Sequence, residues 1–400
     1  MKDLKDWSMQ LKKYSLICFC ILFNIHTLNA EDNYLSQTKQ DLLNYSYEKS
    51  IEDSKALKND WINPIKYSYI YTDTETYDTT KSFISISQPI FKSGGIFSAI
   101  KYANSVKNQT NTNIDIEKKE LIKQTITLLF QIKKINITIN KQKLLISNST
   151  LDVQRKKEQV LNGILDTSFL DNSILELNAN QNTLIDLEYE KDTLINNLSI
   201  LSDKKYEELE LPQLSITTND YYLNNNIYIN QAKDDINTSY WLKNMMISSY
   251  LPTINVTADY TKYHDTDNNP SITDEDIQNV GFNITIPLDI KFSYKIQSTK
   301  IAYLKNKAAL ADKEQQEKSI FQNSIAKIKS LEKKIAIAKN DIQLYDSLVT
   351  QIQEQLNVGM KTQSDLDTIQ NSQNIKKLEI KSLDVDKQLE MLEIYSRMKI

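Results

Sequence analysis

The segment Glu158-Gln159-Val160-Leu161-Asn162-Gly163 recurs about 196 residues later as Glu354-Gln355-Leu356-Asn357-Val358-Gly359. A helical pattern of apolar and polar residues leads into each glycine, and another begins shortly after it. Glycine tolerates the positive φ that ends many helices. Ser168 or Ser364 is expected to cap the helix that follows. Each copy therefore predicts the tip of a helical hairpin, and together they predict a duplicated chain.

Apolar residues recur at a and d heptad positions in the helix before each tip. In the second copy these positions hold Ile328, Leu331, Ile335, Ala338, Ile342, Tyr345, Val349, Ile352 and Leu356. The first copy has the same register, but Gln142, Ser149 and Lys156 stand where apolar residues are expected. The helices after the tips carry matching stripes, from Leu177 to Leu201 and from Ile375 to Leu392. The pattern predicts four coiled-coil helices in two hairpins.

Residues 1–30 have the pattern of a secretory signal peptide. Lys12 and Lys13 precede the apolar run 16–23, and Leu28-Asn29-Ala30 offers a cleavage site. Translation from Met9 is an alternative start, and a membrane anchor is the alternative interpretation. Both cysteines of the chain lie in this segment, so the mature protein is expected to have no disulfide and no cysteine metal site.

Alternating apolar and polar residues predict two strand pairs, each placed before a long helix. In the first half a lead-in helix over 33–60 precedes strands at 65–72 and 84–90, and Gly94-Gly95 opens a helix of about 66 residues. In the second half a connector helix over 227–248 precedes strands at 254–260 and 282–288. We therefore predict a first structural repeat over 31–210 and a second over 211–400.

Four strands with one apolar face cannot close into a transmembrane barrel, because closed barrels need about eight strands or more. The chain must then oligomerise. Two copies would give eight strands with a filled interior, and three would give twelve strands around a conduit. Apolar residues outside the main helical stripe, such as Leu144 and Leu383, suit helices that touch two neighbours. The predicted fold class is mixed and mainly α.

In this duplicated order the residues resemble the TolC-type outer membrane efflux protein family. The resemblance rests on Ser85-Ile86-Ser87-Gln88-Pro89-Ile90-Phe91 with Gly94-Gly95, on Pro287-Leu288, and on the two glycine tips. It covers nearly all of the mature chain. It implies a homotrimer with a 12-stranded β-barrel in the bacterial outer membrane and a 12-helix periplasmic tunnel. Such a protein is the exit duct of a tripartite efflux pump or type I secretion system.

The resemblance also implies partners and site residues. The tips at Gly163 and Gly359 would dock onto a periplasmic adaptor protein, which links the duct to an inner-membrane transporter of the RND or ABC type. Asp365 and Lys361 match an acidic and a basic residue at the tunnel mouth. The sequence departs from the family pattern at Leu356, Phe169 and Thr368, so closure by the family's own network is in doubt. Phe169 is either a hydrophobic gate element or a packing residue, and Asp365 either forms a charged ring or only caps its helix.

Catalytic chemistry finds little support in the composition. Of two histidines, His26 lies in the signal segment and His264 in a polar loop, so no histidine cluster exists for zinc or nucleophilic catalysis. Acidic residues between Asp265 and Asp276 lack the spacing of an EF-hand. The net charge of −4 becomes more negative when the lysine-rich signal is removed, which disfavours nucleic-acid binding. We expect no enzymatic activity, cofactor or metal.

Two other secreted coiled-coil classes remain as alternatives. A periplasmic adaptor (membrane fusion) protein would have one hairpin flanked by Gly-rich β domains, whereas this sequence predicts two hairpins. A non-transporting structural coiled coil would not need apolar alternation in four strands. Both alternatives are therefore disfavoured by the same feature, the duplicated order of strand pair and hairpin.

Overall fold

The computed structural model describes residues 34–75, 78–265 and 276–399. The expected signal peptide and most of the acidic loop after Asp265 lie outside the described residues. The chain forms two compact units, each built from both halves of the sequence. One contains residues 44–116 and 227–317, here called the sheet unit. The other contains the segment before residue 44, residues 117–226 and the chain from residue 318 onward, here called the hairpin unit.

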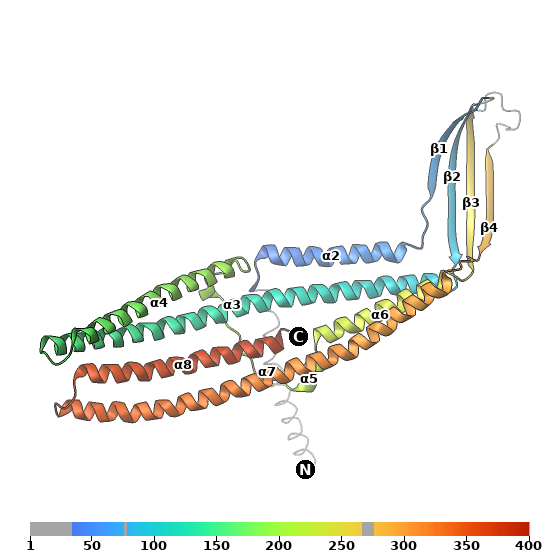
Figure 1. Ribbon diagram of the computed structural model, residues 1–400. Coiled ribbons are helices and arrows are strands. Elements are labelled where there is room, and N and C mark those ends of the chain that lie inside the picture. Colours follow the sequence, from blue (N-terminus) through green and yellow to red (C-terminus); the bar gives the residue numbers. More distant parts are fainter. Residues whose placement is uncertain (1–33, 76–77, 266–275, 400) are drawn as a thin grey trace, which may run out of the picture. The chain divides into compact units, whose positions relative to one another are not determined.

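The sheet unit holds four antiparallel strands in the order β1-β2-β3-β4 (Figure 1). Their bounds are Lys66–Asp73, Asp78–Phe91, Thr253–Asp265 and Ile277–Thr285. Both predicted strand pairs are confirmed, and β2 also pairs with β3 to join them into one sheet. The predicted range for β4, 282–288, is wrong at both ends. Pro287 has no N–H to donate to a ladder, so β4 ends before it.

The two faces of this sheet differ in chemistry, because residues directly opposite each other in antiparallel strands share a face. Tyr67, Ile84 and Tyr260 lie side by side on one face, which continues to Phe282 on β4. Phe282 is 74% exposed. The other face aligns polar residues across all four strands, as in the row Lys66, Ser85, Asp259 and Asn279. One apolar and one polar face is the pattern expected of a strand between lipid and a polar lumen.

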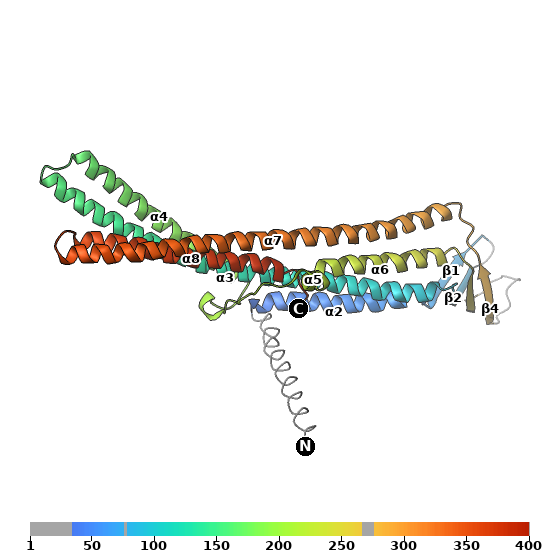
Figure 2. The ribbon, with the colours of Figure 1, turned by 90° about the horizontal axis from the view of Figure 1, so that it is seen from below.

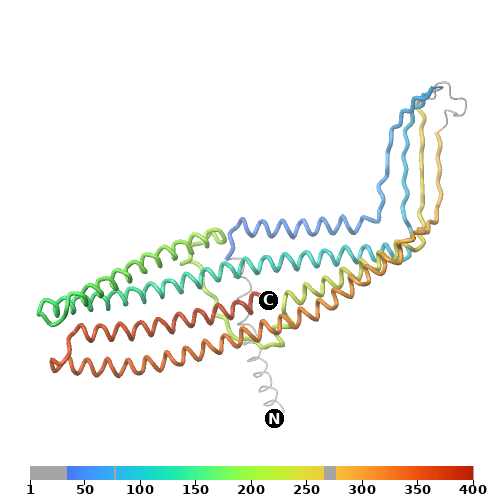
Figure 3. Tube along the Cα trace, viewed as in Figure 1, coloured from blue at the N-terminus to red at the C-terminus, as the bar shows by residue number. Residues whose placement is uncertain are grey.

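All helices that adjoin the sheet meet it at the same end, where each strand is preceded or followed by a helix in the chain (Figure 3). They are α2 Gln37–Asn59 before β1, α3 Gly95–Leu161 after β2, α6 Ile227–Ser248 before β3 and α7 Phe292–Asn357 after β4. The lead-in helix, the connector helix and the long helix of about 66 residues are thus confirmed. Among the described residues, none of the helices has an apolar run sufficient to cross a bilayer.

The hairpin unit contains the tip-side parts of both predicted hairpins. They are the later part of α3 with α4 Thr167–Ser199 and the later part of α7 with α8 Gln363–Tyr395 (Figure 2). Their heptad positions are buried away from the tips, Ile132 and Ile328 most completely, and become half-buried nearer the tips, as at Ile146 and Val349. Gln142 and Ser149, which interrupt the apolar heptads of the first hairpin, form a buried polar layer. The Gln142 side-chain amide donates to the Asn180 carbonyl at 2.9 Å, and Asn180 donates to Ser149 Oγ at 2.8 Å. Gln142 and Ser149 are therefore buried without being unpaired.

A core cluster closes the hairpin unit where α8 ends. It consists of Tyr222, Phe321, Ile328, Met391, Ile394 and Met398. Tyr222 comes from α5 Asn219–Asn224, a short helix that the sequence analysis did not predict, and its ring stacks on Phe321 at 5.1 Å. Charged pairs also join α3 to α8, with Lys123 Nζ 2.6 Å from Glu393 Oε2 and Lys134 Nζ 2.6 Å from Asp386 Oδ1. The unit is thereby fixed at its end away from the tips.

Candidate functional site

Each hairpin tip is built on the same backbone motif, which accounts for the repeated glycine. Gly163 and Gly359 have φ of +70° and +77°. Each glycine N–H donates 3.0 Å to the carbonyl three residues earlier, and the next residue donates 2.8 Å to the carbonyl five earlier. This is the Schellman arrangement, which satisfies carbonyls left open at a helix end. The prediction that both glycines end a helix in the left-handed region is confirmed.

The residues that cap the return helices are not the two predicted serines. Asp166 caps α4 by accepting from the Ser168 backbone N–H at 2.8 Å, and Thr362 caps α8 by accepting from the Asp365 N–H at 3.2 Å. Ser168 and Ser364 stand inside the first turn instead. The correction follows from the tight tip turns, in which the extended N-cap conformation falls two residues earlier than predicted.

Asp365 completes a capping box with Thr362. Its carboxylate accepts from the Thr362 backbone N–H at 3.1 Å and from the Thr362 hydroxyl at 3.0 Å. The backbone hydrogen bond lowers the pKa of Asp365 below its usual value, and the positive charges of Lys361 and Arg155 act in the same direction. Asp365 is therefore ionised at neutral pH while it holds the first turn of α8.

The structure places the predicted site residues at the two hairpin tips. Lys361 lies beside the Asp365 charge at the second tip, and Phe169 lies in the first turn of α4 with 51% of its surface exposed. Sequence reasoning missed further exposed apolar residues at both tips, namely Leu161, Ile164, Val358 and Met360. They stand within two residues of the tip glycines and outside the heptad stripe, and that position was the available signal.

One contact between the hairpins lies a few turns from the tips. Asn371 of α8 donates to Asn148 Oδ1 of α3 at 2.8 Å. Other contacts lie within the second hairpin. Lys376 Nζ of α8 lies 3.2 Å from a carboxylate oxygen of Asp341 on α7 and 3.2 Å from one of Glu379 on its own helix, and these hydrogen bonds raise the pKa of Lys376. The second hairpin is thus held by ionic pairs, whereas neutral amide groups hold the polar layer of the first.

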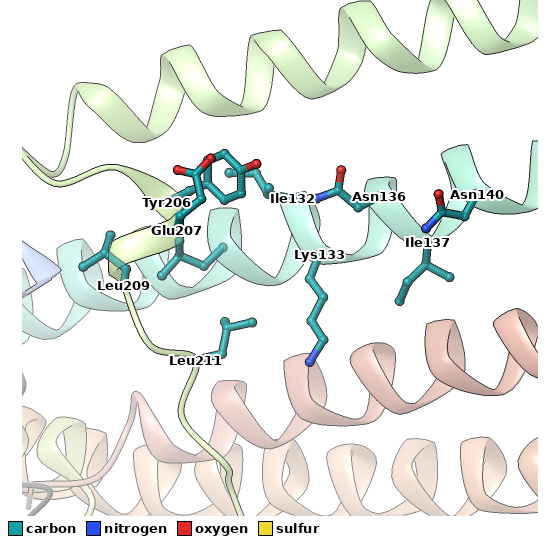
Figure 4. Close-up of a pocket in the computed structure, with 10 residues that line it drawn as sticks. Ile132, Lys133, Asn136, Ile137, Asn140, Tyr206, Glu207, Leu209 and Leu211 are labelled. Carbon is teal, nitrogen blue, oxygen red and sulfur yellow. The ribbon is translucent and has the colours of Figure 1, made fainter.

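A cavity of about 330 Å³ lies between α3 and the segment containing the 3₁₀ turn Tyr206–Glu208 (Figure 4). Lys133 and Asn136 contribute polar groups from α3, and Glu207 does so from the turn. No serine, cysteine or histidine lines this cavity. Within the described ranges, no group of three His, Cys, Asp or Glu side chains could hold a metal ion.

Solved structures with this fold include an outer membrane protein and outer membrane channels. VceC from Vibrio cholerae matches with a TM-score of 0.70 at 10% identity, over 89% of this chain and 92% of that chain. CmeC from Campylobacter jejuni matches with a TM-score of 0.70 at 12% identity, over 92% and 84%. CusC, described as a transmembrane channel, matches with a TM-score of 0.69 at 13% identity, over 93% and 91%.

The sequence itself matches no protein-family model and no curated protein. The structural matches nevertheless cover almost the whole chain in both directions. They define the class of fold, which consists of two helical hairpins and a four-stranded antiparallel sheet. The fold of this chain is that of the outer membrane channels VceC, CmeC and CusC, and the expected TolC-type fold is confirmed.

Replacing Gly359 tests the tip motif. Gly359→Val should destabilise the tip by about 1–2 kcal/mol, because a branched side chain is strained in the left-handed region. Asparagine visits that region readily, so Gly359→Asn is the matched control and should be nearly neutral. Hydrogen–deuterium exchange of residues 355–366 would measure both. Equal exchange in the two variants would show that the backbone conformation does not matter there.

Acidification tests the capping box. A carboxylate with a depressed folded-state pKa gives stability that is present above its unfolded-state pKa and is lost as pH falls through the folded-state pKa. Protection of the first turn of α8 should therefore be complete near pH 7 and decline below about pH 4. Exchange rates corrected for intrinsic chemistry would show this. The Asp365→Asn variant should start less protected and lack the pH-dependent step, and an unchanged step would contradict the assignment.

Proposed function

We propose that this protein is the outer membrane exit duct of a tripartite efflux pump or type I secretion system. The observation that carries the proposal is the sheet, with one apolar face, one polar face and two outer edges, joined in one chain to paired hairpins with the VceC fold. In this function the protein conducts substrates passively. The energy comes from an inner-membrane transporter of the RND or ABC type.

The sheet supports a homotrimer located in the outer membrane. Within the described residues β1 and β4 each pair on one side only, and unpaired backbone groups are costly in lipid. The strands alternate in direction, so β4 of one copy can pair with β1 of the next in an antiparallel ladder. Three copies give a 12-stranded barrel, wide enough for a conduit. Its apolar face would contact outer membrane lipid.

The hairpins support a tunnel that extends into the periplasm. Outside the buried stripe they expose large apolar side chains, including Ile185 and Tyr189 on α4 and Ile337 and Leu344 on α7. Such residues suit helices that pack against neighbouring copies. The exposed apolar residues at the tips, with Gly163 and Gly359 fixing the turns, fit contact with a periplasmic adaptor. Asp365, Lys361 and Phe169 are the proposed tunnel-mouth residues.

The same observations weigh against the two alternatives. A soluble adaptor or a structural coiled coil gains nothing from leaving Phe282 and Tyr67 exposed on one face of a sheet, because large exposed apolar patches promote aggregation in water. Insertion into a bilayer would cover that apolar face with lipid. Folded protein that stays in the soluble periplasmic fraction would favour either alternative.

Lysine substitutions on the two faces of β4 test the barrel. Phe282→Lys places a charge on the apolar face and should cost about 2–4 kcal/mol at the centre of a bilayer. Asn283→Lys is the matched control, since the adjacent side chain points to the polar face and should be tolerated. The measurement is the yield of heat-resistant oligomer in outer membrane extracts. Equal yields would argue against a lipid-facing role for Phe282.

Planar-bilayer recordings test conduction and the charged mouth. The purified wild-type protein should give discrete channel events that divalent cations block, because three copies of Asp365 would form a ring of like charges. Asp365→Ala should relieve the block. The matched control is Thr362→Ala, which breaks the same cap but keeps the carboxylate, and it should remain sensitive to cations.

The outcomes of these recordings distinguish conduction by the duct, the charge of Asp365 at its mouth, and the cap of α8. Relief of the block in both variants would assign it to loss of the cap. Events that are insensitive to either change would keep the duct and remove Asp365 from its mouth. Folded oligomers that neither insert nor conduct would overturn the proposed function.

A further inference from the structure

Four aromatic rings from three helices of the sheet unit form a connected row. Phe97 of α3 meets Trp241 of α6 at a centroid distance of 5.7 Å, Trp241 meets Tyr240 at 5.0 Å, and Tyr240 meets Tyr303 of α7 at 5.8 Å. Three lysines lie over these rings. We call the set the aromatic–lysine cluster: Phe97, Lys101, Tyr240, Trp241, Lys243, Tyr303 and Lys307.

Lys243 is the centre of the cluster. Its Nζ lies 4.7 Å from the Tyr240 ring centroid and 4.9 Å from that of Tyr303, so two rings hold one ammonium group. Lys307 Nζ lies 4.9 Å from the same Tyr303 ring centroid, and Lys101 Nζ lies 5.5 Å from the ring centroid of Phe97. Cation–π contacts of this kind position a charge without neutralising it.

The three lysines have no carboxylate within ion-pair distance in the part of the chain that the structure describes. Several carboxylates of the sheet unit have other partners. Asp235 and Asp234 accept hydrogen bonds from Gln109 and Thr112, and Asp289 pairs with Lys295. The Tyr240 and Tyr303 hydroxyls likewise have no hydrogen-bond partner among the described residues. The cluster therefore offers uncompensated positive charge and two phenolic donors, which suit an anion.

The position of the cluster identifies the kind of anion. Its three helices join the sheet at one end, and Phe97 is the third residue of α3. The apolar surface of the sheet continues into these junctions, where Leu288 and Ile290 are 95% and 92% exposed. Tyrosine, tryptophan and lysine next to such a surface are typical of a membrane interface. Basic residues there attract anionic lipid head groups.

We propose that the aromatic–lysine cluster binds the phosphate of an anionic phospholipid in the membrane leaflet nearest the helices. Lys243 and Lys307, which both lie over the Tyr303 ring, supply the charge. The rings hold the ammonium groups in place, and the tyrosine hydroxyls donate to phosphate oxygens. The proposal rests on the proposed function, because it requires the sheet to lie in a membrane. It adds a specific lipid contact to that function.

The test uses the full-length protein in nanodiscs of phosphatidylcholine with or without phosphatidylglycerol. Native mass spectrometry after mild detergent extraction would count the retained phosphatidylglycerol. The variant Lys243→Gln with Lys307→Gln should lower its affinity roughly fivefold for each lysine. The matched control is Lys300→Gln with Lys305→Gln, two exposed lysines of α7 with no ring contact, which should retain wild-type binding.

The outcomes keep this proposal separate from the proposed function. Wild-type protein that conducts but retains no phosphatidylglycerol in preference to phosphatidylcholine would overturn the lipid site and leave the duct intact. An equal loss in the control variant would also overturn it, by showing attraction to net charge alone. If the double variant folds poorly, Lys243→Arg replaces it as a charge-keeping variant and should bind like the wild type, and a loss of binding with intact folding would contradict the assignment.

Discussion

The backbone groups along the outer edges of β1 and β4 set the main constraint on this protein. Within the described residues these edges have no partner, and a sheet in hydrocarbon cannot leave such a row unpaired. Four alternating strands have their first and last members running in opposite directions, so identical copies can close a ring by antiparallel pairing. Under the proposed function, the need for other copies of the chain thus follows from hydrogen bonding and does not depend on the helices.

In the proposed oligomer, the hairpins have to accommodate the same ring of copies. A helix of 66 or 67 residues gains little from propensity alone, and its stability comes from the stripe that it buries. Each long helix buries one stripe within its own chain and leaves other apolar residues exposed. The two hairpins differ in how they are held. Amide groups fix the polar layer of the first, whereas Lys376 with Asp341 and Lys387 with Glu332 hold the second by charge.

Most of the fold was predictable, because it depends on periodicity. The heptads located the hairpins, alternation located the strands, and the repeated glycine located the tips. What failed depends on local geometry. The helix caps fell on Asp166 and Thr362, although Thr362 and Asp365 already have the Thr-x-x-Asp spacing of a capping box. The bounds of β4 were shifted because apolar residues continue past Pro287 in an exposed junction, where alternation no longer reports a strand.

The site was less predictable than the fold, since a residue type does not fix its contacts. Capping and a charged mouth were posed as alternatives for Asp365, yet the structure makes them compatible. The hydrogen bonds from Thr362 that cap α8 also lower the pKa of the carboxylate and restrict its rotation. A carboxylate held in this way stays ionised beside like charges that would otherwise raise its pKa. The cap is therefore what would let a symmetric ring of these residues remain charged.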